Sequence, residues 1–315
     1  MKLVSVPANP VPEGAVLASI RTPDGVNLRA ARWAPPPGRK GTVCIFQGRT
    51  EFIEKYYETV RDLRERGFAV ATLDWRGQGL SDRLLPDRLK GHVRSFAQYD
   101  ADLETFMREI VLPDCPPPHF ALCHSTGAVV LLRAAARNER WFDRMVFTAP
   151  LLKLIALPLG GLAPPLCTAA RLLGLGTRYV PGGSRQLPGS RPFVGNVLTS
   201  DPVRYARTAA VLEAEPDLAI AGPTFAWVDS MFRATKEFMT PGYPERIRQP
   251  ILIVAAGRDK VVSTPAIEEF AIHLRAGAHL VVPGAMHELL QEQDSYREQF
   301  WAAFDAFVPG TPLFG

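Results

Sequence analysis

One serine lies in a setting typical of a nucleophile. Ser125 stands in the segment Cys123-His124-Ser125-Thr126-Gly127, between an apolar stretch and an Ala/Val/Leu-rich stretch that favours a helix. A strand-to-helix turn that presents a nucleophilic serine usually reads G-x-S-x-G, because the tight turn leaves room for small residues only. Gly127 fits this pattern, whereas Cys123 departs from it with one of the smaller side chains. The segment therefore predicts a nucleophilic serine at the end of a strand.

Two other interpretations start from the same residues. Serine is a common N-cap, so Ser125 could simply cap the helix that begins at Thr126. Cys123 could itself be the nucleophile, although the last residue of a strand is expected to pack beneath the turn as a small hydrophobe. A serine hydroxyl reacts only with a base beside it and an acid to orient that base. The choice therefore depends on the residues that follow.

The base and the acid are sought downstream, because this kind of turn is followed first by Asp or Glu and then by His. Of the three histidines after Ser125, His273 lies within an expected helix and His279 opens an expected strand. His287 follows that strand in a glycine-containing loop. We therefore predict His287 as the base.

Asp259 is the predicted acid. It follows the apolar run Ile251 to Ala255 within four residues and precedes His287, as the chain order requires. Taken alone, an aspartate in such a loop is more often part of an Asx turn. Glu288 and Asp294 are alternative acids, but Glu288 is adjacent to the base and is expected to point away from it.

Acyl transfer also needs donors for a developing oxyanion. The backbone N–H of Thr126, at the positive end of the following helix, is the first candidate. The second is the backbone N–H of Arg49 in the loop Gln47-Gly48-Arg49-Thr50, which follows an early apolar strand. The guanidinium of Arg49 has three alternatives: it could bind a phosphate head group, pair with Glu51 or face solvent.

Alternating apolar strands and helices must position these residues. We expect a hairpin of Val16 to Arg21 and Val26 to Trp33, then strands at 42–46, 68–73, 120–123, 145–148, 251–255 and 279–282, with helices at 51–66, 126–137, 264–274 and 295–307. Continuous apolar strands that alternate with helices predict an α/β fold with a mostly parallel, doubly wound sheet. In such sheets the ligand binds beyond the carboxyl ends of the strands.

Residues 151–241 interrupt this alternation and are predicted to be an inserted cap over the site, with 1–150 and 242–315 forming the core. The cap is rich in Pro and Gly, and residues 151–200 contain no Asp or Glu. The same stretch has five basic residues, Lys153, Arg171, Arg178, Arg185 and Arg191. Apolar residues mixed with unopposed arginine could hold an acyl chain or rest on an anionic membrane. The alternative is that 154–175 packs on the sheet and its arginines are solvated.

The composition is that of an ordinary soluble protein. Hydrophobic residues make up 47% and charged residues 22% of the 315 residues, and the net charge of +4 does not suggest nucleic-acid binding. Four scattered cysteines form no metal-ligand spacing. The apolar start of the chain is too short for a signal peptide, and the longest apolar stretch is broken by Pro and Gly. We therefore expect a cytoplasmic protein, with peripheral contact at the inner membrane as an additional hypothesis.

Several segments carry a resemblance to a known family. They are Gln47-Gly48-Arg49-Thr50-Glu51, Leu73-Asp74-Trp75-Arg76-Gly77-Gln78-Gly79-Leu80-Ser81, Lys90-Gly91-His92-Val93, Ala121-Leu122-Cys123-His124-Ser125-Thr126-Gly127, Gly257-Arg258-Asp259 and Gly284-Ala285-Met286-His287-Glu288. With these, the chain resembles the α/β-hydrolases, and more narrowly the monoglyceride-lipase-like group that includes bacterial lysophospholipases. Segments 196–201 and 222–227 are similar to the cap of the lysophospholipase branch.

The resemblance implies hydrolysis of a carboxylic ester of a single-acyl lipid, a lysophospholipid or a monoacylglycerol, without metal or organic cofactor. It assigns Ser125 as nucleophile, His287 as proton shuttle and Asp259 as the orienting acid, and it gives Arg49 and Thr126 the oxyanion donors. Other matching residues, Asp74, Arg76 and His92, are interpreted as structural.

Two further functions compete with this one. A small-ester carboxylesterase or a serine peptidase of the same fold would share the triad and differ in the cap, and a peptidase that takes free amines would need acidic residues there. A non-catalytic relative that binds a ligand would be expected to lack a triad member, and this chain has all three.

Overall fold

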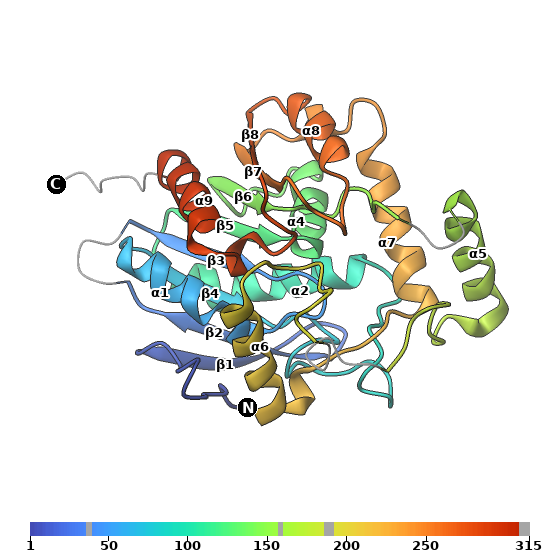
Figure 1. Cartoon of the computed structure of the whole chain (residues 1–315), viewed down its shortest axis with the longest axis horizontal. Helices are drawn as coiled ribbons and strands as arrows, with labels where there is room; N and C mark the ends of the chain where they lie inside the picture. The colour runs from blue at the N-terminus through green and yellow to red at the C-terminus, as the bar shows by residue number, and fades with distance from the viewer. Residues whose placement is uncertain (36–39, 157–159, 186–191, 309–315) are drawn as a thin grey trace.

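The structure, a computed structural model, describes residues 1–35, 40–156, 160–185 and 192–308. Within these residues one eight-stranded sheet has the order β1-β2-β4-β3-β5-β6-β7-β8 (Figure 1). The strands are β1 (Ala15–Arg21), β2 (Asn27–Trp33), β3 (Thr42–Phe46), β4 (Ala69–Leu73), β5 (His119–His124), β6 (Arg144–Thr148), β7 (Ile251–Ala256) and β8 (Gly277–Val282). β2 pairs antiparallel with β1 and β4, and the pairings from β4 to β8 are parallel. The predicted α/β fold with a mostly parallel sheet is confirmed.

The predicted hairpin is present at one edge of the sheet. Ala15 pairs with Trp33 and Arg21 with Asn27, so the register closes on the expected turn. Gly25 in that turn has φ 85°, a conformation that side chains with a Cβ rarely adopt. Every residue of β3, β4 and β7 is buried, because these strands are covered on both faces.

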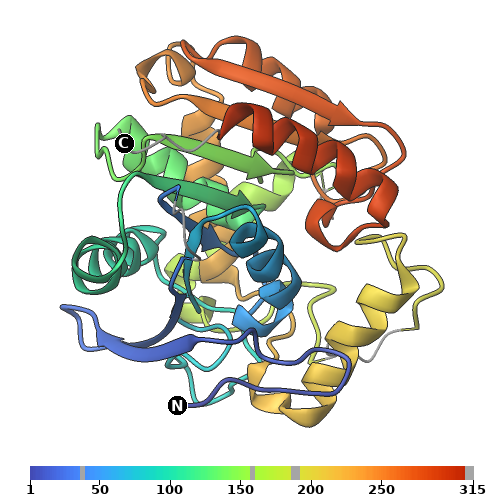
Figure 2. The ribbon, with the colours of Figure 1, turned by 90° about the vertical axis from the view of Figure 1, so that its left-hand side faces the viewer.

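Helices cover both faces of the sheet (Figures 1 and 2). They are α1 (Tyr57–Glu65), α2 (Ala97–Phe106), α3 (Leu112–Asp114), α4 (Thr126–Ala136), α8 (Thr264–Ile272) and α9 (Asp294–Phe307). The apolar side chains of α1 and α9 join one buried cluster, and those of α2, α4 and α8 join the other. The sheet therefore carries a hydrophobic core on each side, and its carboxyl ends remain free for a site.

Two local predictions differ from the structure. The helix expected over 51–66 begins with a 3-10 turn at Ile53–Tyr56, and the α-helix covers Tyr57–Glu65 only. No element was expected between residues 73 and 120, yet α2 and α3 lie there, joined by a π-helical turn at Met107–Val111. The inward face of α2 includes Asp102 and Thr105, so its apolar stripe is interrupted and the helical period is hidden.

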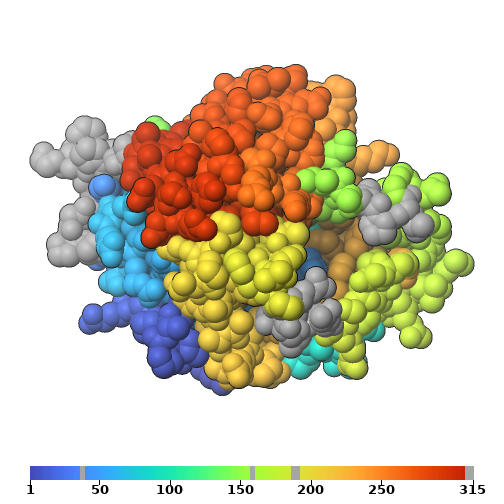
Figure 3. Space-filling view, viewed as in Figure 1, coloured from blue at the N-terminus to red at the C-terminus, as the bar shows by residue number. Residues whose placement is uncertain are grey.

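The described residues between β6 and β7 add helices and no strand to the sheet. These helices are α5 (Ala163–Ala170), α6 (Pro202–Ala214) and α7 (Phe225–Phe238). In Figure 3 a recess opens between the segment that carries α6 and the segment that carries α5. In the described parts of the chain we find no helix long and apolar enough to cross a membrane.

Candidate active site

Ser125 stands on a strained turn between β5 and α4. Its φ of 48° and ψ of −110° lie in a region that favours glycine. Gly127 is needed two residues later, because a Cβ there would meet the carbonyl oxygens of Phe46 at 2.4 Å and Gln47 at 2.8 Å. Ser125 occupies the N-cap position of α4, but its hydroxyl caps none of the helix N–H groups. The interpretation of Ser125 as a helix cap is therefore wrong.

The thiol of Cys123 lies beneath this turn. Its side chain is fully buried, and burial raises the pKa of the thiol well above its ordinary value. Because only a thiolate is an effective nucleophile, Cys123 is unreactive in this position. It packs as the small hydrophobe that the sequence predicts.

The hydroxyl of Ser125 meets the predicted base and acid. The Nε2 atom of His287 lies 3.2 Å from the Oγ atom of Ser125. The Nδ1 atom of the same ring lies 2.8 Å from Oδ2 of Asp259. All three side chains are buried or nearly so. The structure thus brings together three residues that are far apart in the chain, in the geometry of nucleophile, base and orienting acid.

Asp259 is held in place by the backbone that follows it. Its Oδ1 atom accepts the N–H groups of Val261 at 2.7 Å and Val262 at 3.0 Å, which leaves Oδ2 for His287. Burial raises the pKa of the Asp259 carboxyl, but the hydrogen bond and charge of His287 and the two N–H groups outweigh burial, so the pKa falls below its ordinary value. Asp259 is therefore an ionised partner for His287.

The other residues considered as acid or base do not take part in the contacts of Ser125, His287 and Asp259. Glu288 pairs with Lys55, and Asp294 pairs with Arg204. His273 follows the last residue of α8, and His279 is an exposed residue of β8.

The predicted oxyanion donors come from the loop after β3, which contains Arg49, and from the strand-to-helix turn at Ser125, where Thr126 is the first residue of α4. In the described chain neither the N–H of Arg49 nor that of Thr126 donates to a protein acceptor. A Cβ on Gly48 would lie 3.3 Å from the Cβ of Ser125, so the loop and the turn are in close contact. Both backbone donors are therefore free for a ligand, and their role as oxyanion donors stays a prediction.

A buried charge cluster supports the Arg49 loop, and the sequence analysis missed it. Glu51 accepts the N–H of Gly48 at 2.5 Å and the hydroxyl of Tyr56 at 2.7 Å. The ammonium of Lys55 lies 2.8 Å from Glu51 and 2.6 Å from Glu288. Burial raises the pKa of Glu51, and the charge of Lys55 outweighs it to give a lowered pKa. The four-residue spacing of Glu51 and Lys55 was the one available signal.

His124, just before Ser125, packs against the ring of His287. Its ring centroid is 4.8 Å from that of His287, and its Nδ1 atom lies 3.1 Å from Oγ1 of Thr148. Burial lowers the pKa of His124 to about 4, against the opposing charge of Glu51. The ring beside His287 is therefore neutral at pH 7.

The loop that carries His287 is tied to residues between β6 and β7. Glu292 accepts the N–H of Met286 at 2.7 Å through one oxygen and the N–H of Ser200 at 3.0 Å through the other. The N–H of Glu288 donates to the carbonyl of Leu198 at 2.7 Å. The position of the base thus depends on contacts with segment 198–200.

Two of the three residues interpreted as structural carry buried ion pairs. Asp74 pairs with Arg29 at 2.7 Å, and Arg76 pairs with Asp102 at 2.7 Å. The Nδ1 atom of His92 lies 2.9 Å from the hydroxyl of Thr224, and His92 does not line the cavity at Ser125. These contacts fit the structural interpretation.

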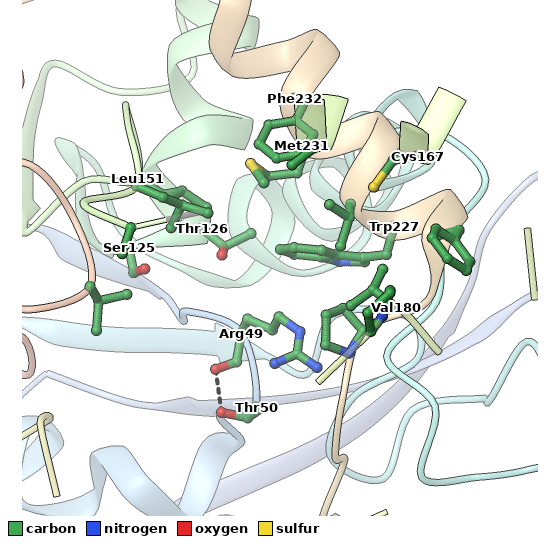
Figure 4. A pocket seen from close by; sticks show the side chains of 18 of the residues that line it. Arg49, Thr50, Ser125, Thr126, Leu151, Cys167, Val180, Trp227, Met231 and Phe232 are labelled. Atoms are coloured by element: carbon green, nitrogen blue, oxygen red, sulfur yellow. Dashed lines mark hydrogen bonds between the residues drawn. The ribbon is translucent and has the colours of Figure 1, made fainter. Parts of the chain in front are cut away.

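A cavity of about 680 Å³ opens onto Ser125 (Figure 4). Most of its wall is apolar, and the residues between β6 and β7 that line it include Leu154, Leu166, Cys167, Leu173, Val180, Trp227, Met231 and Phe232. Of the polar groups, Glu51 and Glu288 share Lys55, and Arg49 points its side chain toward Trp227 (Figure 4). Among the described residues no group of three His, Cys, Asp or Glu could hold a metal ion.

This fold and this arrangement of serine, histidine and aspartate define an α/β-hydrolase. Residues 37–294 match the family model described as serine aminopeptidase, S33, and the chain belongs to this family. It is 30% identical over 269 residues to lysophospholipase L2 of Escherichia coli strain K12, which covers 81% of this chain and 76% of the relative.

Two further comparisons agree with this assignment. A probable lysophospholipase L2 of Haemophilus influenzae is 26% identical over 279 residues, covering 87% of this chain and 85% of the relative. Among solved structures, a soluble variant of a monoglyceride lipase from Saccharomyces cerevisiae, in complex with a substrate analog, gives a TM-score of 0.71 at 19% identity. It covers 93% of this chain and 94% of the yeast chain, and at that identity it shows the fold alone.

Proposed function

We propose that this α/β-hydrolase cleaves the carboxylic ester of a single-acyl lipid, a lysophospholipid or a monoacylglycerol, with Ser125 as its nucleophile. The observation that carries the proposal is the pair of contacts of the His287 ring, 3.2 Å to Ser125 and 2.8 Å to Asp259, at an apolar cavity. The names of the bacterial relatives, lysophospholipase L2, support the same substrate class.

The reaction follows from these contacts. Ser125 Oγ attacks the ester carbonyl while His287 Nε2 takes its proton, and Asp259 stabilises the imidazolium that forms. The N–H groups of Arg49 and Thr126 donate to the oxyanion. His287 then protonates the leaving glycerol oxygen, and a water activated by the same ring hydrolyses the acyl-enzyme.

The shape and lining of the cavity favour an acyl chain. Its volume of about 680 Å³ and its wall of Leu, Val, Trp, Met and Phe side chains suit the burial of a long hydrocarbon. A short ester would leave most of this apolar wall in contact with water. A single-acyl lipid is therefore favoured over a small-ester substrate.

A peptidase that takes free amines is disfavoured by the same cavity. The amine of such a substrate needs an ionised carboxylate without another partner. The acids that line the cavity, Glu51 and Glu288, are each already paired with Lys55 at 2.8 Å and 2.6 Å. The charge available in the cavity is the guanidinium of Arg49, which would repel an ammonium group.

We infer that residues 151–241 act as a cap whose outer face contacts an anionic membrane. Leu162 and Leu172, which lie beside α5 and do not line the cavity at Ser125, are exposed at 65% and 71%. Two of the arginines are opposed by acids outside the basic stretch, which corrects the expectation: Arg171 pairs with Asp229, and Arg185 with Asp87.

Other basic side chains of the cap remain available. In the described residues Lys153 and Arg178 make no ion pair, and Arg191 lies outside them. Exposed leucines together with basic side chains are what an anionic lipid surface attracts. A cytoplasmic enzyme held peripherally at the inner membrane is the corresponding location.

Labelling and turnover test the proposal together. A fluorophosphonate should form one adduct, on Ser125, and His287→Ala should abolish it while the circular dichroism spectrum stays that of the wild type. Lysophosphatidylcholine and monoacylglycerol should be turned over with higher kcat/KM than short aryl esters. A preference for the aryl esters over both lipids would overturn the lipid assignment, and undiminished labelling of His287→Ala would overturn the base.

A further inference from the structure

The side chain of Arg49 enters the cavity rather than pairing with an acid. Its Cζ atom lies 5.3 Å from the ring centroid of Trp227, and Nη2 donates to the carbonyl oxygen of Ala221. Figure 4 shows the Arg49 side chain extending away from Ser125, with its guanidinium beneath the ring of Trp227 and on the side of the view where Val180 lies. The expected alternative of a pair with Glu51 is wrong, because Glu51 is taken by Lys55.

Among the described residues the guanidinium of Arg49 has no counter-ion. No carboxylate of the described residues lies within 4.0 Å of it, and its Nε atom is enclosed without a hydrogen-bond partner. Burial lowers the pKa of Arg49 to about 10, against the weaker opposing effect of Tyr99 and Tyr179. The group is still charged at neutral pH, so the cavity contains a partly desolvated cation with a donor unused. Such a group is costly unless an anion joins it.

The surroundings of the guanidinium form a built pocket. A Cβ on Gly91 would lie 2.8 Å from Nη2, so this glycine leaves the space that the guanidinium occupies in the observed position. Gly91 in turn donates to the carbonyl of Gly222 at 3.1 Å and accepts the N–H of Thr224 at 2.9 Å. Two backbone segments, 89–91 and 221–224, are thereby fastened together around the charge.

Arg49 also lines a second cavity of about 750 Å³. Val180, Pro181 and Pro223 line this cavity and the cavity at Ser125 alike. The guanidinium is therefore at the boundary between the apolar space beside the nucleophile and a space that opens away from it.

We propose that the Arg49 guanidinium binds the phosphate of the substrate's head group, so that this hydrolase is selective for lysophospholipids over monoacylglycerols. This inference rests on the proposed function and narrows its substrate class. A planar guanidinium with free N–H donors matches the oxygens of a phosphate group. A monoacylglycerol offers only hydroxyl groups there and would leave the cation without its anion.

The two ends of Arg49 match the two polar ends of such a substrate. Its backbone N–H is the proposed donor to the ester oxyanion, and its guanidinium is one extended side chain away. In a 1-acyl lysophospholipid the ester and the phosphate are separated by the three-carbon glycerol unit, a span of similar length. Arg49 can therefore contact the oxygen of the scissile carbonyl through its backbone N–H and the phosphate through its guanidinium in the same substrate molecule.

Substrate pairs with the same acyl chain test this assignment. Wild type, Arg49→Met and Arg49→Lys are assayed on lysophosphatidylcholine and on monoacylglycerol in mixed micelles of a neutral detergent. Arg49→Met should lower the ratio of kcat/KM for the phospholipid to kcat/KM for monoacylglycerol by about 10- to 100-fold, because only the phospholipid loses a phosphate contact. Arg49→Lys keeps the charge and loses the planar fork, so it should recover part of the loss.

Arg83 supplies a matched control. Within the described residues the Arg83 guanidinium bonds only to carbonyl oxygens, including those of Asp217 and Arg88. Burial likewise lowers its pKa to about 10, and it does not line the cavity at Ser125. Arg83→Met should change the two kcat/KM values by equal factors. An equal loss on both lipids in Arg49→Met, or no loss on either, would overturn the phosphate assignment.

A binding measurement separates this inference from the proposed function. Ether analogues that cannot be hydrolysed, an alkyl-lysophosphocholine and a monoalkylglycerol, are titrated into wild type and Arg49→Met. Only the phosphocholine ether should lose affinity in the variant, and it should do so even if neither ester were turned over. If inorganic phosphate alone binds wild type as tightly as the ether lipid, the site is one for free anions and the head-group assignment fails.

Discussion

The carboxylate of Glu51 accepts the backbone N–H of Gly48 at 2.5 Å, three residues earlier in the same loop. Gly48 immediately precedes Arg49, whose own N–H is the proposed oxyanion donor. A buried acid therefore fixes the backbone next to the donor, and Lys55 supplies the positive charge that keeps this acid ionised.

Removing the Glu51 carboxylate, which accepts the N–H of Gly48, should lower the turnover of all ester substrates by the same factor. We expect Glu51→Leu to lower kcat by about 100-fold with a smaller change in KM, because a displaced oxyanion donor costs about this much. Glu51→Gln, which keeps an oxygen acceptor, should lose less. Kinetics on a short aryl ester measure the effect without the lipid-binding surface, and thermal unfolding checks that both variants fold. Wild-type kcat in Glu51→Leu would contradict the role of this contact.

The backbone strain at Ser125 should be measurable in inactive variants. Ser125→Ala and Ser125→Gly both remove the nucleophile, so neither should turn over an ester. Glycine ordinarily destabilises relative to alanine, but at φ 48° and ψ −110° it should be more stable by about 1 kcal/mol. Chemical unfolding of the two variants gives the difference. A more stable alanine variant would show that the turn is unstrained.

His124 should make the protein sensitive to acid. Its pKa is about 4 in the folded protein against 6.5 for an ordinary histidine, so between these values the unfolded chain binds more protons. The free energy of unfolding is therefore unaffected by the protonation of His124 above pH 6.5. It falls by on the order of 2–3 kcal/mol as the pH is lowered toward 4, because the unfolded chain takes up a proton that the buried ring does not. Unfolding free energies of wild type and His124→Gln over this range test it.

His92 acts in the same direction, because burial and the charges of Arg94 and Lys90 also lower its pKa to about 4. His124→Gln should consequently flatten the pH dependence only in part, and a double variant with His92→Gln should flatten it further. Identical slopes in wild type and His124→Gln would contradict the lowered pKa.

Membrane contact through the cap should depend on its exposed leucines. The double variant Leu162→Ser/Leu172→Ser should reduce binding to vesicles that contain anionic lipid by at least ~10-fold, since apolar area no longer leaves water. Val203→Ser is a matched control, because Val203 on α6 is exposed at 73%. Sedimentation with anionic and with zwitterionic vesicles measures both. Equal vesicle binding by wild type and the double variant would show that these leucines do not contact the membrane.

The juxtaposition of the three proposed triad residues could be predicted from sequence because each of them follows a strand by a few residues. Ser125, Asp259 and His287 come after β5, β7 and β8, and parallel strands deliver their carboxyl ends to one edge of the sheet. Short local patterns were therefore enough to place residues that are distant in the chain.

Contacts between side chains from different segments could not be predicted in this way. The Lys55 bridge reaches from Glu51 to Glu288, and no periodicity records such a pairing. The direction of the Arg49 side chain depends on the space left by Gly91, and α2 was hidden because Asp102 faces inward to Arg76. The arginines of the cap were expected to be unopposed because Asp229 and Asp87 lie outside the acid-free stretch.

Glu292 and Glu288 form hydrogen bonds with segment 198–200, so the loop that carries the proposed base His287 is held in part by residues outside the predicted core. Exchanging residues 151–241 for those of a relative would therefore disturb turnover itself as well as the choice of substrate. A chimera meant to transplant specificity alone would have to retain Leu198 to Ser200 from this chain, because that short piece holds the loop of the proposed base His287.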